Sequence, residues 1–159
     1  MLRVAILTIS DSCFKGLRKD QSGPAIKKII EEALQADIAG YDIVADEKSR
    51  IKNKLVYYAD KLRVNLVLTT GGTGLSLRDV TPEATREVVE REVPGIAEFI
   101  RADGLKKTKR ALLSRSIAGL RGETLIVNLP GSLKGASESL EAILDILPHA
   151  FDILAGKGH

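Results

Sequence analysis

The sequence has little of several residue types that define other kinds of protein. Its 159 residues include one cysteine, two histidines and no tryptophan. A single cysteine excludes an intrachain disulfide framework, and so few cysteines and histidines exclude a structural zinc site built from them. The cysteine content also suits a reducing, intracellular compartment.

Charge, aromatic content and apolar runs are equally modest. Lys and Arg number 24 against 21 for Asp and Glu, a net charge of +3 without the concentrated basic stripe of a nucleic-acid binder. Three Tyr and three Phe residues provide no stacking platform for bases. The apolar stretch within residues 1–10 is too short for a membrane span and lacks the features of a signal peptide. We therefore expect a cytoplasmic protein whose partners are neither nucleic acid nor membrane.

The hydrophobic pattern alternates between short β-branched runs and amphipathic stripes. This alternation predicts an α/β fold, a three-layer α/β/α domain with a mostly parallel sheet, formed as a single domain over residues 1–159. Ser22 and Thr81 precede helical stripes and are predicted as helix caps. The expected strands cover residues 3–10, 41–45, 64–70, 114–120 and 124–129, and the expected helices begin near residues 24, 51, 81 and 133.

Three of the predicted strands run into loops that mix glycine with hydroxyl and carboxylate side chains. These loops begin at Ser10-Asp11, at Thr70-Gly71 and at Pro130-Gly131-Ser132. Right-handed crossovers place the carboxyl ends of parallel strands on one rim of the sheet, where ligands of such folds bind. We therefore expect the three loops to meet.

The loop Thr69-Thr70-Gly71-Gly72-Thr73-Gly74 is the most informative motif. Consecutive glycines after a buried strand can expose backbone N–H groups as an anion-binding nest, and phosphate is the natural guest. The loop matches neither G-x-x-x-x-G-K-[ST] nor G-x-G-x-x-G. A tight strand-to-helix turn without a ligand is the alternative reading.

Two aspartates are predicted on the same rim. Asp46 ends the second strand, and Asp79 lies between the glycine loop and the helix that begins near Thr81. Either residue alone is most often a turn former or a cap. Two carboxylates beside a phosphate nest suggest a Mg²⁺ site, because this ion is usually held by one or two carboxylates together with substrate phosphates.

Other candidates are weaker. The basic run Lys106–Arg110 is interpreted as a solvated face, with an accessory anion contact as the alternative. Cys13 lacks a supporting His or Lys motif and is interpreted as an incidental loop residue. Ser114 and Arg115 either bind ligand or, in the case of Arg115, form an internal ion pair, and the sequence leaves this open.

Together these motifs resemble the MogA/MoaB family of molybdenum-cofactor proteins, which includes the G domain of gephyrin. The resemblance covers essentially the whole chain in a consistent order, and its longest block, residues 69–85, is specific. The matching stretches are residues 8–12, 20–23, 46–47, 69–74, 78–85, 93–95, 113–115, 119 with 121–122, 127–132 and 147–150.

The resemblance implies a molybdopterin adenylyltransferase, a nucleotidyltransferase that moves AMP from Mg-ATP to the terminal phosphate of molybdopterin and releases pyrophosphate. It implies Asp46 and Asp79 as catalytic and magnesium-binding residues, a homotrimer, and a molybdenum-insertion protein as a possible partner. The alternatives are a molybdopterin-binding carrier without this activity and a trimeric scaffold. The residues implied to bind molybdopterin or phosphate are Ser10, Asp11, Thr70, Gly71, Gly72, Thr73, Gly74, Ser114, Pro130, Gly131 and Ser132.

Overall fold

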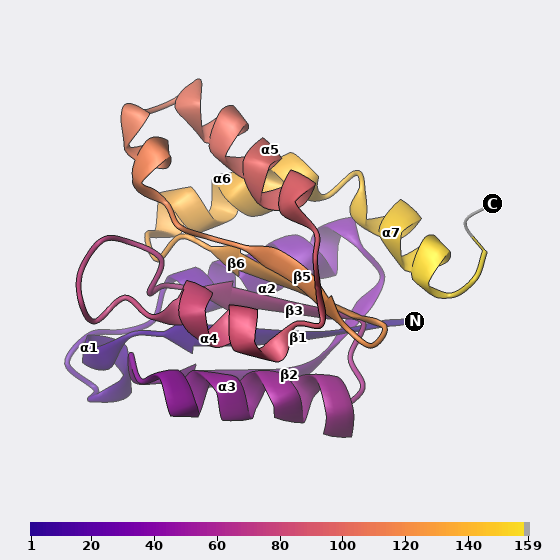
Figure 1. The fold of residues 1–159 in the computed structure, drawn as a ribbon, viewed down its shortest axis with the longest axis horizontal. Coiled ribbons are helices and arrows are strands. Elements are labelled where there is room, and N and C mark those ends of the chain that lie inside the picture. Colours follow the sequence, from indigo (N-terminus) through magenta and orange to yellow (C-terminus); the bar gives the residue numbers. More distant parts are fainter. Residues whose placement is uncertain (158–159) are drawn as a thin grey trace.

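The computed structural model describes residues 1–157, and it places one six-stranded sheet between two layers of helices (Figure 1). The strands are β1 (Leu2–Ile9), β2 (Ala36–Val44), β3 (Leu66–Thr70), β4 (Arg91–Glu92), β5 (Ala118–Arg121) and β6 (Thr124–Leu129). The α-helices are α1 (Asp11–Phe14), α2 (Ser22–Ala33), α3 (Lys48–Val56), α4 (Thr81–Val88), α5 (Pro94–Leu105), α6 (Leu133–Ile143) and α7 (Leu147–Leu154). A π-helical turn, η1 (Tyr57–Lys61), extends α3, and a 3₁₀ turn, η2 (Lys109–Leu113), follows α5.

The strands are ordered β2-β1-β3-β6-β5-β4 across the sheet. Strands β2, β1, β3 and β6 are parallel to one another, whereas β5 runs antiparallel to β6 and β4 antiparallel to β5. Every residue of β3 and β6 is buried, as expected for central strands covered on both faces. The predicted fold class, a three-layer α/β/α domain with a mostly parallel sheet, is therefore confirmed.

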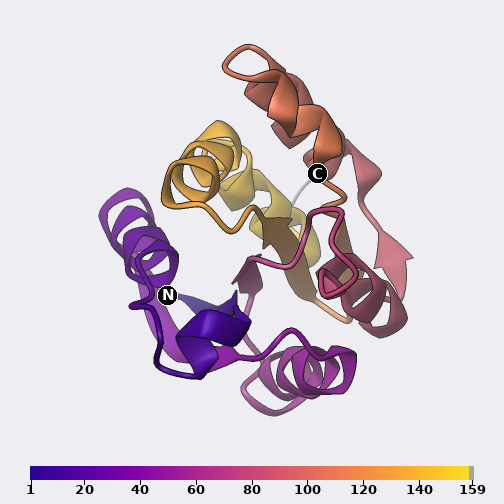
Figure 2. The same cartoon turned by 90° about the vertical axis from the view of Figure 1, so that its left-hand side faces the viewer.

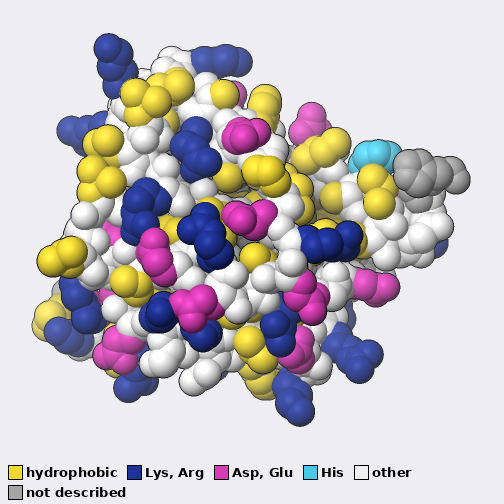
Figure 3. Space-filling model, viewed as in Figure 1, with side chains coloured by type: hydrophobic (Ala, Val, Ile, Leu, Met, Phe, Trp, Pro, Cys, Tyr) yellow, Lys and Arg dark blue, Asp and Glu magenta, His cyan; other side chains and the backbone are white. Residues whose placement is uncertain are grey.

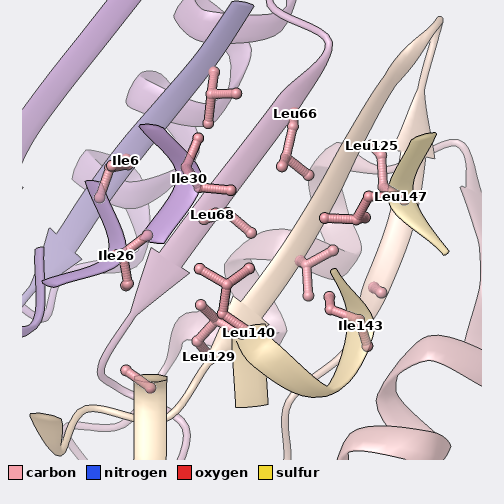
Figure 4. Close-up of a cluster of buried hydrophobic side chains, with 14 of the residues drawn as sticks. Ile6, Ile26, Ile30, Leu66, Leu68, Leu125, Leu129, Leu140, Ile143 and Leu147 are labelled. Atoms are coloured by element: carbon pink, nitrogen blue, oxygen red, sulfur yellow. The ribbon is translucent and has the colours of Figure 1, made fainter. Parts of the chain in front are cut away.

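Two hydrophobic cores lie on opposite faces of the sheet. One joins alternate residues of β1, β3 and β6 to α2, α5, α6 and α7, and Figure 4 shows its centre. The other joins the intervening strand residues to α3 and α4. Figure 2 looks along the sheet and shows the helices on both sides. On the face in Figure 3, acidic and basic side chains are interspersed. Within residues 1–157, no helix is both long and apolar enough to span a bilayer.

The structure corrects several local expectations. Ser22 and Thr81 are the first residues of α2 and α4, and neither caps its helix. Instead, the Ser22 hydroxyl donates to the Gly131 carbonyl at 2.9 Å, and the Thr81 hydroxyl donates to the Gly71 carbonyl at 2.9 Å. Both hydroxyls tie helix starts to neighbouring loops at the rim. The expected strand over 114–120 starts only at Ala118, and the short β4 was not predicted. The prediction of a single domain includes residues 158 and 159, which lie outside the described part.

The direction of the crossovers opens a crevice at one end of the sheet. Helix α2, which follows β1, lies on one face, whereas α4, which follows the adjacent strand β3, lies on the other. Chain segments that leave neighbouring strands toward opposite faces leave a gap at the carboxyl ends of those strands. The site described next occupies this end.

Candidate active site

A hollow of about 360 Å³ lies at the carboxyl ends of β1, β3 and β6. The three loops predicted to meet at the rim all contribute to its wall. Its lining residues are Thr8, Ile9, Ser10, Cys13, Arg18, Asp20, Ser22, Asp46, Thr70, Gly71, Gly72, Asp79, Gly131 and Ser132. We call this the carboxylate hollow, because three aspartates line it.

Two features of the glycine loop require glycine: positive φ angles and a close approach to β1. Gly71 and Gly72 have φ angles of +105° and +69°, and a Cβ at Gly71 would lie 2.1 Å from the Ile9 carbonyl oxygen. The Gly71 N–H donates to the Leu129 carbonyl at 3.2 Å, and so a nest for phosphate would use N–H groups farther along the loop. The tight-turn reading and the ligand-binding reading are thus compatible.

Asp46 is held by a reciprocal pair of hydrogen bonds with Asp11. The Asp11 N–H donates to Asp46 Oδ2 and the Asp46 N–H donates to Asp11 Oδ1, each at 2.9 Å. The Asp11 carboxylate also accepts two hydrogen bonds from the Arg78 guanidinium, at 3.0 and 2.9 Å. Asp11 therefore orients Asp46 and is itself paired with a cation. Its side chain does not line the carboxylate hollow, and its direct contact with phosphate stays a prediction.

The carboxylates differ in electrostatic environment. Burial raises the pKa of Asp46 above its ordinary value, and the negative charges of Asp11 and Asp79 act in the same direction. Hydrogen bonds from Arg78 hold the pKa of Asp11 below its ordinary value. An additional cation near Asp46 and Asp79 would therefore relieve repulsion between carboxylates.

The carboxylate oxygens of Asp46 and Asp79 are of the ligand type that Mg²⁺ prefers. A Cβ at Gly72 would lie 3.1 Å from Asp46 Oδ1, and a Cβ at Gly74 would lie 2.9 Å from Asp79 Oδ2, so the glycines let the loop backbone approach both carboxylates. Residues 1–157 contain no cluster of three or more His, Cys, Asp or Glu side chains placed to hold a metal by themselves. Two carboxylate ligands, completed by substrate phosphates and water, are a common arrangement for Mg²⁺.

A second, larger hollow of about 750 Å³ adjoins the first. We call it the basic hollow, because four cationic side chains line it: Arg101, Lys107, Arg110 and Lys134. Ser132 lines both hollows, and the glycine loop passes between them, with Gly71 and Gly72 on one side and Thr73 and Gly74 on the other. The predicted residues Ser114 and Pro130 also line the basic hollow.

Sequence reasoning missed part of each wall. Arg18, Asp20, Thr8 and Ser22 line the carboxylate hollow but were not predicted as site residues. In the basic hollow, the run Lys106–Arg110 was the only signal for the cationic side chains, and Lys107 and Arg110 do face a cavity. Cys13 is buried in the wall of the carboxylate hollow.

Comparison with known proteins identifies the family. Residues 5–149 match the family model described as "Probable molybdopterin binding domain". The chain belongs to the molybdopterin-binding domain family. A Helicobacter pylori member named molybdopterin adenylyltransferase is 42% identical over 157 residues, covering 98% of this chain and 89% of that protein. An Escherichia coli member of the same name is 39% identical over 145 residues, covering 91% and 74%.

Solved structures of family members share the fold. The molybdopterin biosynthesis enzyme MoaB from Thermus thermophilus has a TM-score of 0.93 and 54% identity, with 99% of this chain and 98% of that chain covered. The Mog protein of molybdopterin biosynthesis from Mycobacterium ulcerans has a TM-score of 0.88 and 35% identity, covering 97% and 99%. The resemblance to MogA and MoaB proteins drawn from the motifs is therefore confirmed.

Proposed function

We infer that this chain is a molybdopterin adenylyltransferase, which transfers AMP from ATP to the terminal phosphate of molybdopterin and releases pyrophosphate. Relatives named for this activity are about 40% identical over nearly the whole chain. The structural observation that carries the proposal is the pair of adjoining hollows, one lined by carboxylates and one by cations, with a glycine loop between them.

We assign the phosphates of ATP to the carboxylate hollow and molybdopterin to the basic hollow. Asp46 and Asp79 would hold Mg²⁺, which supplies charge neutralisation on the nucleotide phosphates when it is bound. The cationic side chains of the basic hollow suit a substrate with a terminal phosphate, and its volume is in the usual range for small-molecule sites. Ser132, which lines both hollows, lies where the reacting phosphates would meet.

In this arrangement, an oxygen of the molybdopterin phosphate attacks the α-phosphorus of ATP. The bond between that phosphorus and the oxygen bridging the α- and β-phosphates breaks, and pyrophosphate leaves. The protein needs no nucleophile of its own, and its contribution is orientation and charge. The Ser132 hydroxyl caps the eleven-residue helix α6 by accepting from the Gly135 N–H at 3.0 Å. The positive end of that helix dipole would favour a phosphate beside Ser132.

The decisive experiment incubates the protein with molybdopterin, ATP and Mg²⁺ and measures pyrophosphate and adenylylated molybdopterin. Formation of both products supports the proposal. Binding of molybdopterin without pyrophosphate release would identify a carrier instead, and the absence of both would favour a scaffold. Omitting Mg²⁺, with and without excess chelator, tests the proposed requirement for the ion.

The remaining proposals concern the location, the oligomeric state and the partner of the enzyme. From the family resemblance we propose a cytoplasmic homotrimer whose adenylylated product passes to a molybdenum-insertion protein. Light scattering coupled to size exclusion tests the assembly, since a trimer has three times the 17.2 kDa mass of the chain. A monomeric or dimeric mass at micromolar concentration would contradict it.

A further inference from the structure

Arg115 holds the segment that carries Asp79 at three backbone positions. The Arg115 Nε donates to the Gly74 carbonyl at 2.8 Å, and one terminal nitrogen donates to the Asp79 carbonyl at 2.7 Å. The Arg115 backbone N–H donates to the Thr73 carbonyl at 2.9 Å. A single residue therefore joins both ends of the loop between Gly74 and Asp79, which we call the Asp79 loop (residues 74–79).

Glu83 fixes the Arg115 guanidinium, and Arg101 fixes the backbone on either side of Arg115. Glu83, in the first turn of α4, accepts two hydrogen bonds from Arg115, at 2.6 and 3.3 Å. Arg101, on α5, donates to the carbonyl of Ser116 at 2.8 Å and to that of Ser114 at 3.3 Å, on either side of Arg115. Planar forked donors give such contacts a defined geometry that an ammonium group cannot reproduce.

The middle of the Asp79 loop has little packing of its own. Leu77 is 98% exposed and Leu75 is 66% exposed. Asp79 makes two local contacts within the loop: its Oδ2 accepts from the Ser76 N–H at 3.0 Å, and its N–H donates to the Ser76 carbonyl at 2.9 Å. Arg78, in the same loop, also donates to the Asp11 carboxylate at 3.0 and 2.9 Å. The position of the loop relative to the sheet therefore depends on this pair and on the hydrogen bonds that Arg115 makes at the two ends of the loop.

We propose that Arg115 is a positioning residue for AMP transfer: it fixes the Asp79 loop and so places the Asp79 carboxylate at the carboxylate hollow. This inference rests on the proposed function. Arg115 lines neither hollow, and its four side-chain hydrogen bonds go to Gly74, Asp79 and Glu83. It acts through Asp79 and does not touch substrate.

A matched control exists at the opposite end of the sheet. Arg121 donates to both carboxylate oxygens of Asp60, at 3.1 and 2.9 Å, and to the Val88 carbonyl at 2.9 Å. It thus makes the same kind of fork as Arg115 but lines neither hollow, and it pairs with Thr124 at the start of β6, opposite the end of that strand at which the carboxylate hollow lies. Comparing Arg115→Lys with Arg121→Lys separates the general effect of losing a forked arginine from the specific effect of releasing the Asp79 loop.

In the AMP-transfer assay, Arg115→Lys is expected to lower kcat by about 10- to 100-fold, because displacement of a reacting group by about an ångström has effects of that size. The KM values for ATP and molybdopterin should stay within about threefold, since no substrate contact is removed. Arg121→Lys should keep kcat within about twofold of the original protein. An unchanged kcat in Arg115→Lys, or a rise in KM alone, would overturn the inference.

A second readout does not depend on activity. The Arg78 side chain is paired with Asp11, so trypsin cleavage after Arg78 reports release of the Asp79 loop from that partner, with the fragments identified by mass spectrometry. Arg115→Lys should speed this cleavage by about tenfold or more, whereas Arg121→Lys should leave it unchanged. An unchanged cleavage rate in Arg115→Lys refutes the inference whatever the activity. If the original protein transfers no AMP, the proposed function fails, and the cleavage rates still decide whether Arg115 holds the loop.

Discussion

The two hollows adjoin each other yet are built from opposite chemistry. The smaller is lined by Asp20, Asp46 and Asp79, with Arg18 as its cation. The larger is lined by Arg101, Lys107, Arg110 and Lys134, partly balanced by Asp103 and Glu138. Both proposed substrates carry phosphate, so charge attraction alone would have made both walls basic.

The difference separates two physical tasks. Carboxylates repel a bare phosphate but bind a cation that bridges to it, and this arrangement suits the phosphates at which the reaction takes place. Cationic side chains bind an anion directly and suit a substrate that must be held and aimed. The carboxylate hollow should therefore control kcat, and the basic hollow should control KM for molybdopterin. Each prediction below tests this division.

The largest effect is expected in the carboxylate hollow. Asp79→Asn should lower kcat for AMP transfer by about a hundredfold or more, as does removal of one well-placed charge-stabilising group in other enzymes. Binding of molybdopterin, measured by equilibrium titration, should change by less than about threefold, because Asp79 does not line the basic hollow. Asp60→Asn, at the far end of the sheet, is the control. Near-normal turnover of Asp79→Asn would remove this residue from the catalytic role.

The next effect concerns the loop that divides the hollows. Gly71→Ala combines a positive φ with a Cβ placed 2.1 Å from the backbone oxygen of Ile9, and should reduce the free energy of unfolding by about 2 kcal/mol or more. Gly122 also has a positive φ, of +57°, but a Cβ there would meet open space. Gly122→Ala should lose only about 1 kcal/mol, the cost of the backbone conformation. Chemical denaturation of both variants measures the difference, and equal losses would show that the approach to Ile9 does not constrain the loop.

The fold and the meeting of three loops followed from local patterns. The buried runs that became β1, β3 and β6 are continuous and apolar, and parallel strands bring Ser10, Gly71 and Gly131 to one edge of the sheet by geometry alone. Ser22 and Thr81 were wrongly predicted as helix caps. Their hydroxyls donate to backbone carbonyls of other loops, and a local sequence pattern cannot show such acceptors. Those acceptors, Gly131 and Gly71, lie 109 and 10 residues away in the sequence.

The basic hollow and the role of Arg115 could not be predicted for a related reason. The hollow forms where α5 and η2 face α6, and its shape depends on packing between segments about 30 residues apart in the sequence. The contacts of Arg115 reach back 32 to 41 residues. The sequence could name the two options for Arg115, ligand binding or an internal ion pair, but only the fold decides in favour of the second.

A smaller effect is expected in the basic hollow. Arg110→Gln removes one of its four lining cations and should raise KM for molybdopterin by about five- to tenfold, the usual size of one charge-assisted hydrogen bond at a partly exposed site. The kcat at saturating molybdopterin and the KM for ATP should both stay within about twofold. Arg91→Gln, on β4 and lining neither hollow, is the control for net charge. If Arg110→Gln lowers kcat instead, the assignment of kcat to the carboxylate hollow and of KM to the basic hollow is wrong.

The smallest effect concerns the Arg115–Glu83 ion pair, and it is a pH dependence of the stability of the protein. Hydrogen bonds from Arg115 hold the pKa of Glu83 below its ordinary value, so folding favours the ionised carboxylate. The resulting stability is fully present above the unfolded-state pKa and is lost as the pH falls through the folded-state pKa. Because the Glu83 side chain is 42% exposed, solvent screening limits its contribution to less than about 1 kcal/mol. Glu83→Gln should therefore unfold about 1–3 °C below the original protein at neutral pH, and this gap should close as the pH is lowered below about 4.

The control is Asp60→Asn. It should show the same closing gap in unfolding temperature, because Arg121 lowers the pKa of Asp60 in the same way. Only Glu83→Gln should also lower kcat, since of the two pairs only Arg115–Glu83 supports the Asp79 loop. Equal kcat values in the two variants would mean that the Arg115–Glu83 pair stabilises the fold without positioning Asp79.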